Sequence, residues 1–246
     1  MSADEVYDTT FAADMTVMEE TAEFLRRMEA GGPFPMFTSC CPAWIRYLEH
    51  DVDLVLTTQE VIQMIQEAGI RFGELQGEAP DMPFGLGTGA GVIFGTTGGV
   101  AEAVARRVME SESKNTLQAI AHSGLRGTDG IRAAELTVGD KAVRIGVVHG
   151  LANAKRLIAK MEAGEEHFDL IEVMTCTNGC VGGAGQPRGL TPQKQARAEG
   201  LYEADRGSLI KSSQANPILN ALDQKITTEE AHHLLHVHYP GEDAQA

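Results

Sequence analysis

The sequence has few cysteines, few aromatic residues and few positive charges. Only four of its 246 residues are cysteines, whereas a disulfide-stabilised secreted domain is smaller and much denser in them. Lys and Arg total 20 against 35 Asp and Glu, a net charge of −15, so binding to nucleic acid or to an anionic membrane is not expected.

Long apolar runs are also missing. No stretch of about 18 apolar residues, the length that a membrane-spanning helix needs, occurs in the chain. Residues 1–5 are acidic and lack the positively charged start of a signal peptide. From these features we expect a soluble, cytoplasmic protein.

Apolar patterns and turn residues predict alternating helices and strands. The length suits one large domain or two small lobes, and an apolar content of 43% is typical of globular proteins. The capping box Thr16–Glu19 predicts the start of a helix that Gly31 ends, and Thr57–Glu60 predicts the start of another. Strands are predicted over residues 35–38, 54–56, 132–138, 141–148 and 168–174, with a hairpin turn at Gly139-Asp140.

The chain changes character after Arg188. No strand pattern follows, and helices are predicted over about 191–204, 216–224 and 227–236. The order of elements therefore indicates an α/β core with an α-helical C-terminal tail.

The four cysteines form two close pairs, Cys40-Cys41 and Cys176-x-x-x-Cys180, each directly after a predicted strand. In α/β proteins the ends of strands usually carry the chemistry. Glycines surround the second pair, and because glycine has no Cβ, the backbone there can approach a bulky inorganic group. The alternatives are buried core cysteines or a zinc site, although only one pair has the spacing usual for zinc.

The cysteine pairs lie in two longer segments, Phe37–Trp44 (FTSCCPAW) and Glu172–Pro187 (EVMTCTNGCVGGAGQP). These segments resemble the first and third cluster motifs of the [FeFe]-hydrogenase family. Gly89–Gly99 (GAGVIFGTTGG), between them, is similar to the same family. Residues 197–202 and 232–239 resemble its small-subunit segment.

The resemblance implies a fold and a division of the chain. The expected architecture is α/β, with mixed sheets flanked by helices in two lobes around a buried cluster site and an α-helical C-terminal tail. Residues 1–188 would form a truncated large-subunit-like catalytic domain, and residues 189–246 a small-subunit-like helical segment.

The resemblance also implies an H-cluster, a [4Fe–4S] cubane joined through a cysteine to a two-iron unit with CO, cyanide and a dithiolate bridge. Cys41, Cys176 and Cys180 are the implied cubane ligands, with Cys180 bridging to the two-iron unit. Cys40 is the implied last proton donor. The other implied cofactor-binding residues are Met174, Phe94, Gly183, Gln186 and Pro187.

Two glutamates match the carboxylates of the family's proton path. Glu20 and Glu23 are three residues apart, so a helix would present them on one face, where they could pass protons to one another. The alternative interpretation is a pair of ordinary solvated charges.

One motif of the family is missing. The family has Met-Pro-Cys-x-x-Lys between the first cysteine pair and the strand that begins here near Asp53, but Tyr47–His50 runs almost directly into that strand. Several tens of residues are therefore absent, among them the fourth cubane cysteine. His50 and Asp51 are candidate replacements, because imidazole and carboxylate groups both bind iron; the alternative is that both are surface residues.

Three functions follow from these observations. The first is a ferredoxin-dependent [FeFe]-hydrogenase that interconverts protons plus electrons and H2 and is assembled by maturation enzymes. The second is a non-catalytic or H2-sensing iron–sulfur protein, and the third an incomplete hydrogenase fragment. Because an acidic surface repels an acidic ferredoxin, the first requires either a local basic patch or a different electron carrier.

Overall fold

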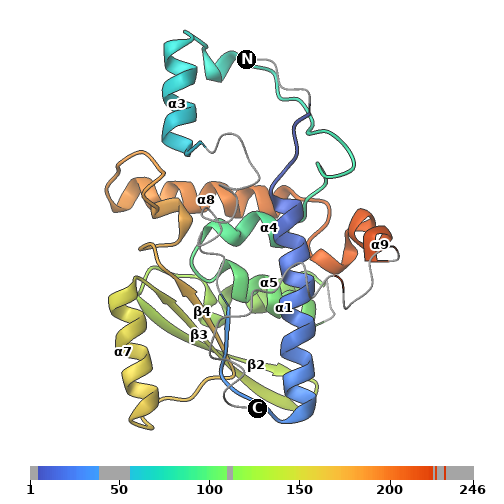
Figure 1. Cartoon of the computed structure of the whole chain (residues 1–246), viewed down its shortest axis with the longest axis vertical. Helices are drawn as coiled ribbons and strands as arrows, with labels where there is room; N and C mark the ends of the chain where they lie inside the picture. Colours follow the sequence, from blue (N-terminus) through green and yellow to red (C-terminus); the bar gives the residue numbers. More distant parts are fainter. Residues whose placement is uncertain (1–4, 39–55, 110–112, 224, 226–229, 231–246) are drawn as a thin grey trace.

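The computed structural model describes residues 5–38, 56–109, 113–223, 225 and 230. Within them, four strands form one mixed sheet in the order β1-β4-β3-β2 (Figure 1). Strand β4 runs parallel to β1 and β3, whereas β2 runs antiparallel to β3. The strands are β1 (Met36–Thr38), β2 (Ile131–Val138), β3 (Lys141–His149) and β4 (Leu170–Met174).

The described residues also form helices, which together with the sheet confirm the mixed α/β fold. These helices are α1 (Thr10–Ala30), α3 (Thr58–Glu67), α4 (Gly89–Val92), α5 (Gly99–Val108), α6 (Lys114–Ile120), α7 (Leu151–Glu162), α8 (Thr191–Gly207) and α9 (Pro217–Asp223). After residue 188 the described residues contain helices and no strand, as predicted. None of the described helices has the length and apolar character needed to cross a bilayer.

Each face of the sheet is covered by different helices. Phe24 of α1, Val104 of α5 and Ile120 of α6 form one buried cluster with Ile145 and Leu170 of the strands. On the opposite face, α7 packs against β3 and β4 (Figure 1). Neighbouring residues of β3, Val147 and Val148, belong to the two different clusters because successive strand side chains point to opposite faces.

The predicted hairpin is confirmed, but the predicted start of the first helix is wrong. Helix α1 begins at Thr10, where the Asp8 carboxylate accepts a hydrogen bond from the Thr10 backbone N–H at 2.9 Å. Thr16 lies inside the helix and donates its hydroxyl to the Ala12 carbonyl at 3.1 Å instead of capping. Gly31 ends α1 in the left-handed conformation, as predicted.

The box Thr57–Glu60 caps α3 with both of its reciprocal hydrogen bonds, as predicted. Of the strand predicted over 54–56, only Leu56 is described, and it is not in a strand.

A buried carboxylate from the sheet fixes α5. Glu172 of β4 accepts hydrogen bonds from the backbone N–H groups of Gly98 at 2.6 Å and Ala101 at 2.8 Å. These groups belong to the first turn of α5, whose free N–H groups favour a negative partner. Burial raises the pKa of Glu172 to about 7, while the backbone donors act in the opposite direction.

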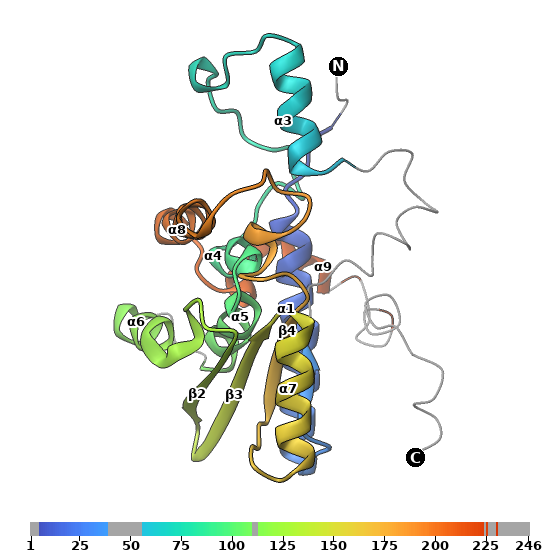
Figure 2. The same cartoon turned by 90° about the vertical axis from the view of Figure 1, so that its left-hand side faces the viewer.

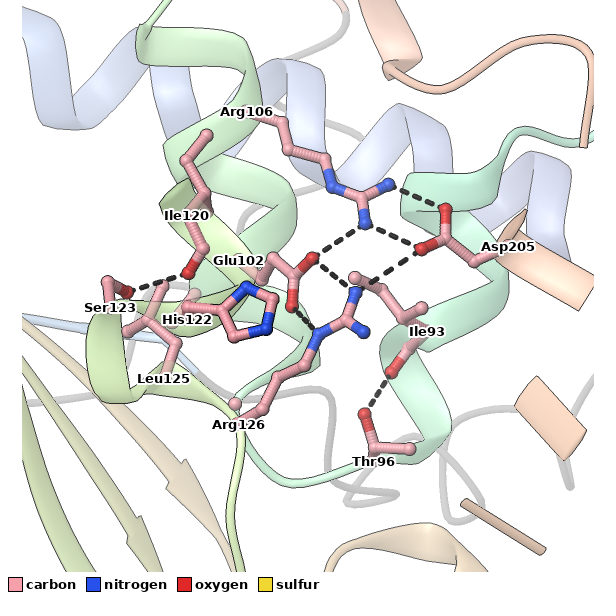
Figure 3. A network of polar contacts seen from close by, with 12 residues as sticks. Ile93, Thr96, Glu102, Arg106, Ile120, His122, Ser123, Leu125, Arg126 and Asp205 are labelled. Atoms are coloured by element: carbon pink, nitrogen blue, oxygen red, sulfur yellow. Dashed lines mark hydrogen bonds and ion pairs between the residues drawn. The ribbon is translucent and has the colours of Figure 1, made fainter. Parts of the chain in front are cut away.

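A buried ion-pair network joins α5 to α8 (Figure 3). Arg106 donates to both carboxylate oxygens of Asp205 at 2.7 Å and to Glu102 at 2.6 Å. Arg126 donates to both oxygens of Glu102 and stacks over the Tyr202 ring, 4.1 Å from its centroid. The network ties the C-terminal helical segment to the sheet domain.

A second buried carboxylate, Asp14 of α1, makes a similar connection. It accepts hydrogen bonds from the Thr88 backbone and hydroxyl, from the Ser213 hydroxyl and from the Asn216 amide. Helix α1, the start of α4 and the segment after α8 therefore share one polar core.

Candidate cofactor site

The loop that follows β4 carries two of the predicted metal ligands. Cys176 is half-buried and Cys180 is exposed, and neither is joined in a disulfide bond. Asn178 and Gly179 between them have positive φ angles of 69° and 83°. A Cβ at position 179 would lie 2.7 Å from the Thr97 nitrogen, so only glycine lets the loop pack this closely against the 96–97 turn.

Gly183 lies directly beside a predicted ligand. A Cβ built on it would stand 3.6 Å from the Cys176 Sγ and 3.0 Å from the Cys180 carbonyl oxygen. The absence of a side chain at position 183 therefore leaves space next to the Cys176 thiol.

A cavity of about 360 Å³ brings together Cys180 and Phe94, two of the predicted site residues. Phe94 is half-buried and packs against the cluster of Val17, Ala90 and Ala103. The remaining lining residues come from α1, from α4 and the turn after it, and from α8: Thr9, Thr10, Ala13, Gly91, Val92, Gly95 and Leu201. The cavity is thus built from both parts of the predicted division of the chain.

The other four predicted cofactor-binding residues, Gly183 among them, lie outside the lining of this cavity, as does Cys176. Met174 is buried at the end of β4, and its carbonyl accepts a hydrogen bond from Gly150. Gln186 donates its side-chain amide to the Thr58 hydroxyl at the start of α3, at 3.0 Å. The Pro187 carbonyl accepts from Arg197 of α8 at 2.7 Å.

Two residues that shape this loop were not assigned a role from the sequence. Arg197 donates to the carbonyls of Val181 and Pro187 and so fixes both ends of the glycine-rich turn. His149 accepts from the Asn178 backbone N–H at 3.3 Å, while its other ring nitrogen lies 3.2 Å from the Thr128 carbonyl. Both act on backbone groups, which leave no pattern in the sequence.

Burial lowers the pKa of His149, which keeps the imidazole neutral. A neutral ring can accept at one nitrogen and donate at the other, as this pair of contacts requires.

Both predicted proton-path carboxylates lie on α1, one turn apart. Burial raises the pKa of Glu20 to about 7, with the Thr38 hydroxyl and Arg27 acting against it. Glu23 pairs with Arg26 at 3.0 Å and with Arg27 at 2.6 Å. The first glutamate can exchange a proton near neutral pH, and the second is paired with two arginines.

Cys40 and Cys41, and with them His50 and Asp51, lie outside the described residues. Among those that are described, no group of three or more His, Cys, Asp or Glu side chains is placed to hold a metal ion. The described part of the site therefore consists of two thiols, a glycine turn and a cavity, on an α/β scaffold. Cysteine thiolates are the usual ligands of iron–sulfur groups.

Comparisons with known proteins identify the class. The family described as "Iron only hydrogenase large subunit, C-terminal domain" matches residues 1–52 and 49–184, and the "Iron hydrogenase small subunit" family matches residues 192–241. The chain belongs to the iron-only hydrogenase family.

Two similar proteins agree with this. The NADP-reducing hydrogenase subunit HndD of Solidesulfovibrio fructosivorans is 34% identical, over 96% of this chain and 53% of its own length. A variant of [FeFe]-hydrogenase HydA1 from Chlamydomonas reinhardtii has a similar structure, with a TM-score of 0.71, 31% identity, and coverage of 96% of this chain and 84% of that chain.

The comparisons also include a more distant relative with a different name. The cytosolic iron-sulfur assembly component 3 of Rattus norvegicus is 23% identical, over 95% of this chain and 66% of its own length. The chain spans about half the length of HndD. The alignment with HndD extends over 312 residues, more than the 246 of this chain, so HndD carries several tens of residues that have no counterpart here.

Proposed function

We propose that this chain holds an H-cluster and interconverts protons plus electrons and H2. The observation that carries the proposal is the pair Cys176 and Cys180 on one glycine-rich loop, with Cys180 opening into the cavity that Phe94 lines. Membership of the iron-only hydrogenase family supports the same cofactor.

The described residues fit such a group. Thiolates are the usual ligands of a [4Fe–4S] cluster, and two cysteines lie on one loop. The space beside the Cys176 Sγ and the cavity of about 360 Å³ at Cys180 suit a bulky inorganic group. In this proposal Cys41 is the third ligand, and the bound group supplies the redox chemistry.

The chain itself would supply the path for protons. Cys40 is proposed to exchange protons with the cofactor, and Glu20 and Glu23 to carry them toward the surface. A raised pKa of about 7 at Glu20 supports this role, because a relay group works best when its pKa lies near the ambient pH.

The proposed partners follow from the same chemistry. Ferredoxin or a similar electron carrier would deliver electrons, and maturation enzymes would install the two-iron unit. We propose that the protein works in the cytoplasm, where thiols stay reduced.

The test is co-expression with maturation enzymes, followed by iron analysis, infrared spectroscopy and an H2-evolution assay. The parent chain should contain iron, show CO and CN bands and evolve H2. Cys180→Ala should lose the bands, because the proposed bridge to the two-iron unit is gone. Cys40→Ala is the comparison variant: it should keep the CO and CN bands but lose H2 evolution. H2 evolution equal to that of the parent would contradict the proposed proton role of Cys40.

A second function is supported by the relative named for iron–sulfur assembly and by the segment that HndD has and this chain lacks. In this alternative the chain binds an iron–sulfur cluster without turning over H2. Bound iron with no CO or CN bands after maturation would select it over the first function.

A further inference from the structure

Helix α3 has an apolar side that the described residues leave at least partly exposed. Its sequence places Val61, Ile62, Met64 and Ile65 within two turns, yet none of its residues is buried in the structure. The side chain of Val61 is 41% exposed. A capped helix with such a pattern normally packs its apolar stripe against a partner.

The segment after α3 adds to this surface. Ile70, Phe72, Leu75 and Met82 are exposed by 45%, 69%, 59% and 61%. Figures 1 and 2 show α3 and the following segment standing away from the sheet and its covering helices. We call α3 together with residues 70–82 the α3 surface. Large apolar side chains gathered in one protruding segment mark an interaction site.

The N-terminal end of α3 is hydrogen-bonded to the glycine-rich loop that follows β4. The Gln59 backbone N–H donates to the Gly185 carbonyl at 3.0 Å, and Gln186 donates to the Thr58 hydroxyl at 3.0 Å. Gly185 itself packs against the Thr57 side chain. A molecule seated on the α3 surface would therefore lie next to the loop that carries Cys176 and Cys180.

The comparisons with known proteins indicate which polypeptide would bind to the α3 surface. The two matches to the large-subunit family meet and overlap at residues 49–52, only a few residues before α3 begins at Thr58. An insertion at this junction accounts for the several tens of additional residues of HndD. In such relatives an additional segment directly precedes α3 in the sequence, and this chain lacks that segment.

We propose that the α3 surface docks a separate polypeptide equivalent to that segment, and that the cofactor site is completed by it in trans. The role of the complex rests on the proposed function, but the binding step does not, because it involves only the apolar side of α3 and its extension.

The experiment uses the full chain, without iron, and one defined probe. The probe is the part of HndD that aligns opposite the junction at residues 49–52, produced as a separate polypeptide. Binding is followed by isothermal titration calorimetry and stoichiometry by sedimentation. The parent chain should form a one-to-one complex. Val61→Glu should weaken binding by about tenfold or more, because the complex would bury an unpaired charge.

Ile158→Glu on α7 is the matched control, since Ile158 is 43% exposed and Val61 41%. It should bind the probe as the parent does. Circular dichroism and the thermal midpoint check that both variants remain folded.

Three results would overturn the inference. These are an absence of probe binding by the folded parent, equal loss in both variants, and self-association of the parent that Val61→Glu abolishes. The last result would assign the surface to a second copy. Failure of binding in a chain that shows CO and CN bands and evolves H2 contradicts this inference alone. Binding of the probe with no CO or CN bands even in the matured complex contradicts the proposed function alone.

Discussion

Glu20 and Glu23 lie on one face of α1 but have different environments, so they differ in how readily they exchange a proton. Glu20 is held where burial raises its pKa to about 7, whereas Glu23 is paired with two arginines. At neutral pH the first is divided between its two protonation states. Residue type alone could not distinguish them, because the distinction comes from neighbours brought in by the fold.

The raised pKa of Glu20 predicts how stability changes with pH. The folded chain keeps a proton that the unfolded chain releases above pH 4.5, so this group makes the fold less stable as pH rises from about 4.5 to 7. Glu20→Gln removes that dependence. Relative to the parent, the variant should gain unfolding free energy between pH 5 and pH 7.5, measured by urea denaturation of the iron-free chain.

Glu29→Gln, at an exposed position of the same helix, should follow the parent curve at both pH values. If Glu20→Gln also follows it, the Glu20 carboxyl does not titrate with a raised pKa in the folded chain.

At the scale of elements, the contact between α5 and α8 depends on buried charges. Burial alone lowers the pKa of Arg106, but its pairs with Asp205 and Glu102 outweigh burial and raise the pKa, so Arg106 stays charged. Both partners are buried as well. The contact is therefore favourable only while the set of charges is complete.

Arg106→Met should destabilise the chain by about 3–5 kcal/mol, since two carboxylates lose a buried partner. Arg206→Met is the matched control on α8, because Arg206 pairs with Glu199 at the surface. An exposed pair of this kind contributes less than about 1 kcal/mol. Chemical denaturation measures both; equal losses in the two variants would show that burial does not set the strength of the network.

Local signals predicted several elements correctly, because their causes are local. The hairpin at Gly139 and the caps at Thr57 and Gly31 each depend on residues within a few positions. The start of α1 was placed too late because a capping-box pattern at Thr16 also fits the interior of a helix. The register of that helix is set by distant partners of Asp14.

The candidate site was predictable only in part. Cys176, Cys180 and the glycines stand close together in the sequence, so their shared loop could be foreseen. The bonds of Arg197 to backbone carbonyls and the contact of Gln186 with α3 could not, since neither depends on a sequence pattern. The cavity joins Thr10, Phe94, Cys180 and Leu201, which only the folded chain brings together.

At the scale of the whole molecule, the predicted boundary between residues 188 and 189 does not separate two independent bodies. Asp205 and Ser213 from the second part satisfy Arg106 and Asp14 of the first, and Leu201 helps to line the cavity. A chain cut at this boundary would leave buried charges without partners, which costs several kcal/mol for each.

Residues 1–188 produced alone should therefore lack a cooperative thermal transition. Co-expression with residues 189–246 as a second polypeptide should restore that transition, and the two pieces should copurify. Introducing Arg106→Met into the first piece should weaken copurification, whereas Arg206→Met in the second should not. A cooperative transition of residues 1–188 alone, at the midpoint of the full chain, would show that the sheet domain does not need the helical segment. The shared polar core of Asp14 and Arg106 argues for the opposite result: the division visible in the sequence joins two parts of one folding unit.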